Sequence, residues 1–259
     1  MTTDNFERIL YQADGPVARV TLNRPEQRNA LDGDTIRELK VALGTAEADP
    51  GVRVLLLRGA GEHFCAGADL MAMHEIAQHC DAIENLQDAA ALGQLFIRMR
   101  QCRCIIVAAV HGNAIAGGAG LATACDIILA SEDAVFGYPE VNIGFVPAMV
   151  MGLLRRALGE KMAFELVARG ERISAADAAR IGLVNRVFPP EHFEAAVEKW
   201  LLGLAARSGS ALQLTKRLFY GIDMMPVEQA IGRGAEVNAL ARFTPDCRDG
   251  VRRFIDRDG

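Results

Sequence analysis

The chain has 259 residues, 51% of them hydrophobic, which is enough to bury a large core in one or two domains. Its 28 basic and 33 acidic residues give a formal net charge of −5 without a basic run, so composition does not support nucleic-acid binding. The N-terminus lacks a signal-peptide pattern, and the longest apolar stretch, around residues 143–154, is too short to span a bilayer. We therefore expect a soluble, cytoplasmic protein with no membrane partner.

The N-terminal part of the chain predicts a hairpin followed by a helix. Residues 9–12 and 18–22 are strand candidates on either side of an Asp-Gly-Pro turn signal. Asp32 can cap the following helix, because apolar residues recur at helical spacing from Ile36 to Leu43.

Three continuous apolar runs follow, at residues 54–57, 105–110 and 127–130. Such runs are typical of strands that are covered on both faces, as in a parallel sheet. Because strand, turn and helix patterns alternate up to about residue 190, the sequence predicts a mostly parallel α/β sheet over this part.

The pattern changes after residue 190. Phe193, Val197 and Leu201 belong to one apolar helical stripe, and no strand pattern follows it. We therefore expect a helical C-terminal region. Its further helical patterns occupy residues 210–220, 226–240 and 246–256.

The six cysteines predict neither a metal site nor a disulfide framework. Cys102 and Cys104 are separated by one residue and lack the second pair that a zinc site uses. Cys65 and Cys125 lie in apolar or small-residue patterns and are expected in the core. Free thiols are typical of a reducing compartment.

Two glycine-containing turns are the most informative segments. Residues 112–126 (GNAIAGGAGLATACD) follow the apolar run 105–110 and lead into a helix of small residues. Residues 64–70 (FCAGADL) form a second turn after an earlier strand. A turn without bulky side chains lets a ligand approach backbone N–H groups. Two such turns can supply two donors to one oxygen, which is the minimal oxyanion hole.

Two common glycine-rich motifs do not fit. A phosphate-binding loop requires lysine where this chain has Gly118, after Gly112 and Gly117. A dinucleotide fingerprint requires a third glycine where the chain has Thr123 or, in the earlier turn, Phe64. For either turn alone, tight helix packing remains an alternative explanation of its glycines.

The motifs resemble those of the crotonase (enoyl-CoA hydratase/isomerase) superfamily, in order and over nearly the whole chain. The resemblance rests on residues 22–25 (LNRP) with 29–31 (NAL), 64–70, Gly117-Gly118, 136–144 (FGYPEVNIG), and 173–178 (ISAADA) with 182–184 (GLV).

The resemblance implies an α/β fold, with a crotonase-like repeated ββα spiral core and a helical C-terminal region. Residues 1–190 would form the core with a CoA-thioester site. Residues 191–259 would form the helical region, which covers the active site and makes oligomer contacts in a homotrimer or a dimer of trimers. The family's enzymes act in fatty-acid metabolism, and CoA enters as part of the acyl-CoA substrate, so no cofactor and no metal are expected.

The resemblance also implies the catalytic groups. The N–H groups of Ala68 and Gly117 would stabilise an enolate oxygen, and such donors can contribute about 10²–10³ in rate. Glu140 would transfer the proton, because its apolar neighbours are expected to raise its pKa. A surface glutamate is the alternative for Glu140. The expected substrate-binding residues are Arg28, Ala66, Gly67, Asp69, Leu70, Gly118 and Gly120.

One departure from the family pattern affects the reaction. Two-glutamate hydratases carry a second glutamate three residues after the oxyanion-hole glycine, where this chain has Gly120. Loss of one acid or base typically costs about 10²–10⁴-fold. A double-bond isomerisation needs only one base, so the sequence favours it.

Three alternatives remain open. Hydration could use a replacement base from residues 70–95, with Glu75, Asp81 and Glu84 as candidates, although a solvated helix face is the simpler interpretation. The fold could also serve as a non-catalytic acyl-CoA-binding protein. Met149 and Met151 could line an apolar acyl pocket or belong to an ordinary core helix.

Overall fold

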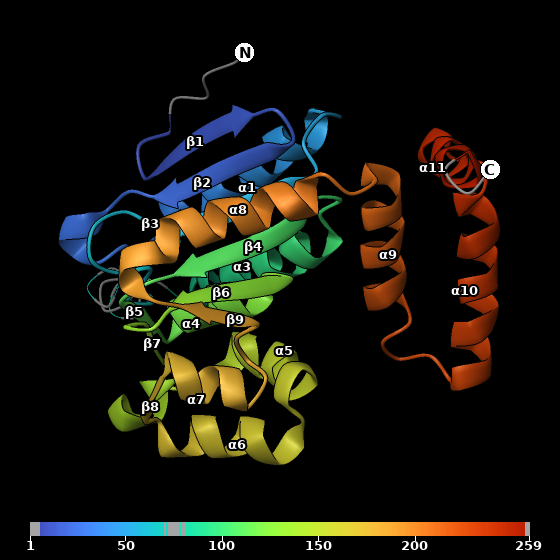
Figure 1. Ribbon diagram of the computed structural model, residues 1–259. Coiled ribbons are helices and arrows are strands. Elements are labelled where there is room, and N and C mark those ends of the chain that lie inside the picture. Colours follow the sequence, from blue (N-terminus) through green and yellow to red (C-terminus); the bar gives the residue numbers. More distant parts are fainter. Residues whose placement is uncertain (1–5, 70, 72–77, 79–80, 257–259) are drawn as a thin grey trace.

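The computed structural model describes residues 6–69, 71, 78 and 81–256, and its centre is a six-stranded sheet of order β1-β2-β3-β4-β6-β9 (Figure 1). β1 pairs antiparallel with β2, and every later pair in this sheet is parallel. The predicted hairpin and parallel sheet are therefore confirmed. The strands are β1 (Ile9–Asp14), β2 (Val17–Leu22), β3 (Val54–Gly59), β4 (Ile105–Val110), β6 (Ile127–Ser131) and β9 (Arg186–Phe188).

A second sheet has three strands in the order β5 (Asn113–Ile115), β7 (Val135–Gly137) and β8 (Arg172–Ser174). This sheet was not predicted: the sequence pattern indicates a turn after the apolar run 105–110 and then a helix, without a strand between them. Strands of three residues are too short to show a period of two in the sequence. The strand β5 positions the glycine turn, because its last residue, Ile115, pairs with Gly137 of β7.

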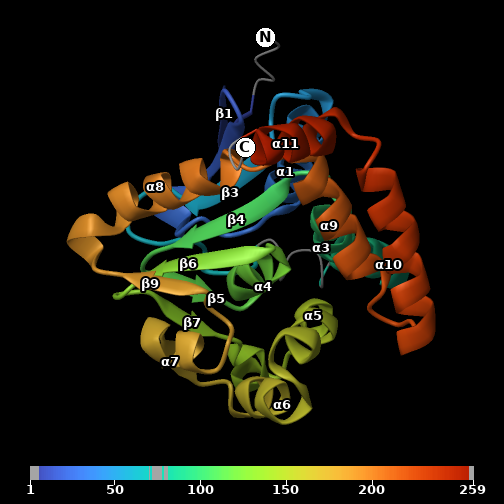
Figure 2. The same cartoon turned by 45° about the vertical axis from the view of Figure 1, so that its right-hand side comes forward.

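Helices cover both faces of the main sheet (Figures 1 and 2). α1 (Gly33–Ala48), α3 (Ala82–Gln101) and α4 (Gly117–Ala124) bury their apolar residues against one face. α8 (Phe193–Ala205) packs on the other face through Phe193, Val197, Leu201 and Ala205. The predicted cap of α1 is present, since the Asp32 side chain accepts a hydrogen bond of 2.7 Å from the Thr35 N–H.

The chain between β7 and β8 of the second sheet carries the segment that matters for the site. The short 3₁₀ helix η2 (Pro139–Ile143) follows β7 directly and leads into α5 (Ala148–Leu158). α6 (Glu160–Arg169) and α7 (Ala175–Arg180) complete a small unit below the main sheet in Figure 1. Two other 3₁₀ helices are η1 (Pro25–Gln27) and η3 (Pro190–His192).

The C-terminal region is helical, as predicted, and its last three helices stand beside the sheet (Figures 1 and 2). They are α9 (Gly209–Gly221), α10 (Val227–Ala241) and α11 (Pro245–Ile255). α9 is attached through Lys216, whose Nζ lies 2.6 Å from Asp126 Oδ2 and also donates to the carbonyls of Met99 and Cys104. None of the helices in the described part of the chain is long and apolar enough to traverse a membrane.

Candidate active site

The turn after β3 is held by backbone hydrogen bonds to the segment before α1. The Leu31 N–H donates to Gly67 O at 2.8 Å, and the Asp69 N–H donates to Leu31 O at 3.0 Å. Gly67 has φ +100°, a conformation that residues with a side chain rarely adopt. The two bonds flank Ala68 and leave its own N–H pointing away from this pairing.

The second turn lies against the first. The Cys65 N–H donates to Asn113 O and the Ile115 N–H donates to Cys65 O, each at 3.0 Å. Gly118 allows this approach, since a Cβ atom there would lie 2.2 Å from Cys65 O. Ala116 has φ 51° although it is not glycine, a strain of about 1–3 kcal/mol that surrounding bonds must hold.

These contacts bring two backbone donors together. A Cβ atom on Gly117 would lie 3.5 Å from the Ala68 nitrogen, so the two N–H groups border one small space. Gly117 is the first residue of α4, where an N–H has no intrahelical acceptor. Within the described part of the chain, neither N–H donates to another group. The two residues therefore lie close together, and binding of one ligand oxygen by both N–H groups stays a prediction.

Two residues that the sequence analysis did not assign to the site support the first turn. The Arg24 guanidinium donates to Asp69 Oδ2 at 3.2 Å and to Ala30 O at 2.7 Å. The Asn29 side chain bonds to the carbonyls of Ala60 and His63. Both residues lie in the motifs 22–25 and 29–31, but a motif alone does not reveal which turn it holds.

Glu140 lies on η2 and is buried, with 9% of its surface exposed. Its Oε2 atom has no hydrogen-bond partner among the described residues. Burial raises the pKa of the Glu140 carboxyl above its usual value, because the charged form loses hydration. A proton acceptor with a raised pKa and no hydrogen-bond partner on one oxygen is suited to acid–base catalysis near neutral pH.

The space beside Gly120 is occupied by apolar groups. A Cβ atom there would lie 3.1 Å from Phe96 Cζ and 3.5 Å from Val150 Cβ, and both side chains are 3% exposed. Phe96 comes from α3 and Val150 from α5, which pack on either side of α4. The sequence identified the absence of a carboxylate at Gly120 but not the residues that fill its place.

The predicted substrate-binding residues differ in how exposed they are. Arg28 has an exposed side chain, and its carbonyl accepts a bond of 2.9 Å from the half-buried Ala66. Leu70 lies outside the described residues. The substrate-binding roles of these residues, and of Gly67, Asp69, Gly118 and Gly120, stay predictions.

The alternative bases have structural roles or lie outside the described residues. Asp81 and Glu84 are exposed and form a capping box at the start of α3, in which each side chain accepts from the other residue's N–H. Glu75 lies outside the described residues. Among those that are described, no cluster of His, Cys, Asp or Glu could hold a metal ion.

The cysteines predicted in the core are buried there. Cys65 is fully buried in the first turn, and burial raises the pKa of its thiol to about 12, so it is no nucleophile at neutral pH. Cys125 is also buried, at the end of α4.

A protein-family model described as enoyl-CoA hydratase/isomerase matches residues 12–258. The chain belongs to the enoyl-CoA hydratase/isomerase family. It is an enzyme of this family, whose members act on acyl-CoA. A short-chain-enoyl-CoA hydratase of Clostridium acetobutylicum is 33% identical, over 97% of this chain and 96% of its own length. A Thermus thermophilus relative, provisionally named an enoyl-CoA hydratase, is 42% identical over 94% of this chain and 96% of its own length.

Solved structures agree with the family and confirm the predicted crotonase-like fold. An enoyl-CoA hydratase of Mycobacterium smegmatis superimposes with a TM-score of 0.92 at 31% identity and covers 97% of both chains. The predicted spiral core with a helical C-terminal region is therefore the fold of this enoyl-CoA hydratase/isomerase family member.

Proposed function

We propose that the protein moves the double bond of an enoyl-CoA thioester between the β,γ and α,β positions, with Glu140 as the one base. The observation that carries the proposal is the apolar filling beside Gly120 by Phe96 and Val150. A second acid or base, which hydration needs, has no room there. Glu140 and Glu38 are the two acidic residues that are buried as whole residues in the described part of the chain, and Glu38 accepts from the N–H groups of Glu7 and Arg8.

The proposed reaction uses the two backbone N–H groups and the Glu140 carboxylate. The thioester oxygen accepts hydrogen bonds from the N–H groups of Ala68 and Gly117. Glu140 takes a proton from C2 of a 3-enoyl-CoA, the electrons move into a dienolate, and negative charge gathers on the bonded oxygen. Glu140 then returns the proton to C4, and the double bond lies between C2 and C3. Fixed donors stabilise the dienolate more than the substrate, so they lower the barrier.

The acyl group is proposed to be apolar. Side chains after Glu140 are exposed and hydrophobic, including Phe145, Val146 and Met149. Met149 also lies against α3, since its sulfur is 3.4 Å from the Cβ position of Gly93. CoA enters as part of the substrate, and no cofactor is needed for a proton transfer of this kind.

Hydration is the second candidate, because the relatives from Clostridium acetobutylicum and Syntrophomonas wolfei are named as hydratases. It would require a base other than the exposed Asp81 and Glu84. A non-catalytic acyl-CoA-binding role is disfavoured by the buried, unpartnered carboxylate oxygen of Glu140, which has a cost in stability and no structural bond to offset it.

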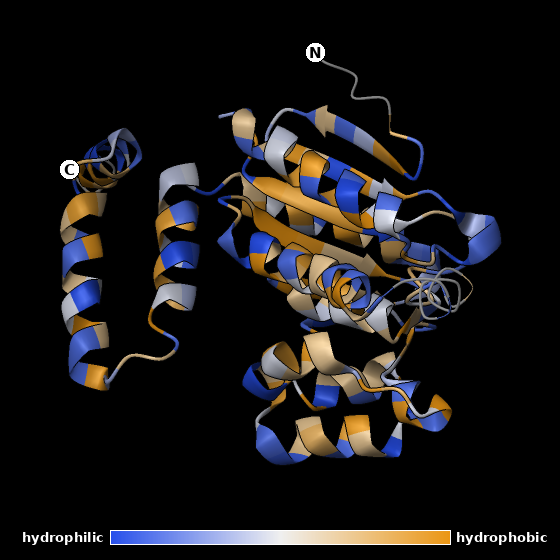
Figure 3. Cartoon of the chain, turned by 180° about the vertical axis from the view of Figure 1, so that it is seen from behind, coloured by the Kyte–Doolittle hydropathy of each residue, from blue (hydrophilic) through white to orange (hydrophobic). Residues whose placement is uncertain are grey.

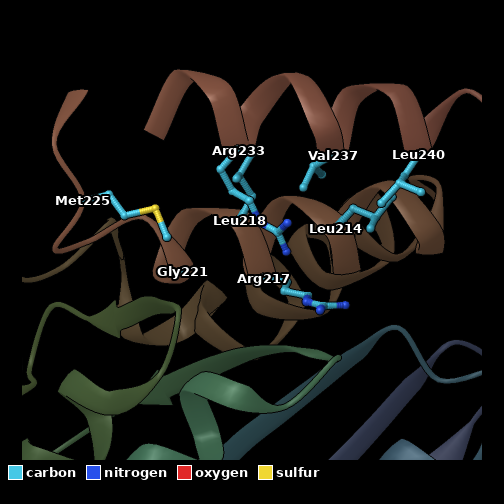
Figure 4. A pocket seen from close by; sticks show the side chains of 8 residues that line it. All are labelled: Leu214, Arg217, Leu218, Gly221, Met225, Arg233, Val237 and Leu240. Atoms are coloured by element: carbon cyan, nitrogen blue, oxygen red, sulfur yellow. The ribbon is translucent and has the colours of Figure 1, made fainter. Parts of the chain in front are cut away.

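We further propose that the protein is a homotrimer or a dimer of trimers whose contacts involve α9–α11. No described residue of α10 or α11 is buried, although Ile231, Leu240 and Phe254 are large and apolar. In Figure 3 these helices alternate between hydrophobic and hydrophilic segments, whereas the central strands are mainly hydrophobic. A cleft of about 240 Å³ between α9 and α10 is lined by leucines such as Leu214 and Leu240 (Figure 4).

Exposed apolar surface of this kind marks an interface. A cytoplasmic location is proposed with it, since the five cysteines that the structure describes are free thiols.

Two parallel incubations distinguish isomerisation from hydration. The purified protein is given a trans-3-enoyl-CoA and, separately, a trans-2-enoyl-CoA, and the products are identified by mass and chromatography. Conversion of the 3-enoyl to the 2-enoyl isomer without a change in mass is expected. A gain of water from the 2-enoyl substrate as the main product would overturn the one-base proposal. Binding of both thioesters without turnover would favour the non-catalytic role.

The oligomer is tested separately with Phe254→Asp, which should lower the mass measured by light scattering. Phe164→Asp is the matched control, because Phe164 is equally exposed but lies on α6. An unchanged mass in Phe254→Asp, or a wild-type monomer, would contradict the proposed contacts.

A further inference from the structure

A buried hydroxyl pair joins the segment of Glu140 to the helix of the oxyanion hole. Thr123 lies in the last turn of α4, and its Oγ1 is 2.8 Å from the hydroxyl oxygen of Tyr138. Thr123 Oγ1 also lies 2.7 Å from Ala119 O in its own helix, and a carbonyl can only accept. The single Thr123 proton is therefore used in that bond. It follows that Tyr138 donates its hydroxyl proton to Thr123, which in turn donates to Ala119 O.

Tyr138 is held as a neutral donor. Its side chain is completely buried, and burial raises the pKa of the phenol, with the negative charge of Glu140 adding to the rise. The phenol and the carboxylate are thus close enough to interact electrostatically. A buried phenol keeps its proton throughout the range in which the enzyme works, so the bond to Thr123 does not depend on ionisation.

A second bond fixes the residue before Tyr138. The Ala116 N–H, at the start of α4, donates to Gly137 O at 2.8 Å. The segment that leads to Glu140 is therefore attached to α4 at both ends of that helix, by a backbone bond from Gly137 and a side-chain bond from Tyr138.

We propose that the hydrogen-bonded pair of Tyr138 and Thr123 positions the Glu140 carboxylate relative to the N–H groups of Ala68 and Gly117. Both are positioning residues, because neither supplies a proton to the substrate. The inference rests on the proposed role of Glu140 as base. Its physical basis is that a proton acceptor must lie within a few tenths of an ångström of its productive place, and misplacement by about 1 Å can cost 10²-fold in rate.

The test follows proton removal itself rather than a net reaction. Butanoyl-CoA carrying deuterium at C2 is incubated with the full-length enzyme, and loss of the label to water is measured by mass as a function of substrate concentration. This exchange requires the base and the oxyanion hole, and it requires neither hydration nor isomerisation. Its failure is therefore distinct from failure of the proposed net reaction.

Tyr138→Phe and Thr123→Val each remove one hydroxyl, and Thr123→Ser keeps it. Each loss should lower the maximal exchange rate about ten-fold, with the half-saturating substrate concentration changed less than two-fold. Thr123→Ser should restore most of the rate. Because the two hydroxyls act as a unit, the maximal exchange rate of the double variant Tyr138→Phe/Thr123→Val should be no lower than that of the less active single variant.

Tyr220→Phe is the matched control. Tyr220 lies on α9, and its hydroxyl donates to Asp126 Oδ1 at 2.7 Å. This variant should leave the exchange rate unchanged despite losing a comparable hydrogen bond. A rate in Tyr138→Phe equal to that of wild type, or a loss equal to that of Tyr220→Phe, would overturn the proposal.

Discussion

The two sides of the candidate site are built in different ways. On the proposed donor side, Ala68 and Gly117 have backbone N–H groups without an acceptor among the described residues, and the adjoining turns are held by main-chain bonds and by Arg24. On the base side, a single carboxylate has an oxygen without a partner, and exposed apolar residues follow it. In the proposed reaction the donors are thus backbone groups set by the fold, whereas proton transfer would depend on one replaceable side chain. Substitutions should therefore affect the two sides differently.

The largest effect is expected on the base side. Glu140→Gln keeps the size of the side chain but cannot take up a proton, so isomerisation should fall by about 10²–10⁴-fold. The fold should persist, since Oε2 makes no hydrogen bond to lose. The measurement is the initial rate with a trans-3-enoyl-CoA, alongside the circular dichroism spectrum. A rate within ten-fold of wild type would show that another group is the base.

The donor side is tested by adding a methyl group where the substrate oxygen would bind. In Gly117→Ala the new Cβ lies 3.5 Å from the Ala68 nitrogen, an ordinary contact that the fold tolerates but that blocks the space between the donors. The rate should fall by about 10²–10³-fold. Gly203→Ala, the same change in α8 with no atom within 4 Å of its Cβ, is the control. Equal rates for the two variants would argue against this oxyanion hole.

The donor side could be proposed from the sequence because each of its two turns is local in the chain. A strand, a glycine turn and a small-residue helix are adjacent in the chain, so their pattern could be recognised around Ala68 and Gly117. The apolar wall that Phe96 and Val150 form beside Gly120 could not be predicted. These two residues come from separate helices, which meet only when α3 and α5 pack on α4. The same applies to Tyr138 and Thr123, whose bond joins segments 15 residues apart.

The reaction itself should change when the wall beside Gly120 is replaced. Gly120→Glu alone collides with Phe96, 3.1 Å from the new Cβ, and overpacking of this kind costs about 1–3 kcal/mol. Phe96→Leu removes the ring atoms that cause the collision. The double variant should therefore be more stable than Gly120→Glu and should gain hydration of a trans-2-enoyl-CoA, measured by mass. Hydration by the wild type at the same rate would show that the wall does not select the reaction.

The smallest expected effect is on the stability of Glu140→Gln. The pH dependence of its Tm relative to wild type tests whether the pKa of Glu140 is raised. Burial raises the pKa of Glu140 in the folded state, so the folded protein holds this proton more tightly than the unfolded chain does. The resulting stabilisation is complete below the unfolded pKa and is lost as pH rises through the raised folded pKa. Glu140→Gln stays neutral, so its Tm should exceed that of wild type at pH 7 and match it at low pH. Glu132→Gln, at an exposed position, controls for loss of a charge, and calorimetry from pH 4 to 8 makes the measurement. A Tm difference that does not vary with pH would mean that burial does not disfavour the Glu140 carboxylate, and the base side would then lack the raised pKa that distinguishes it from the donor side.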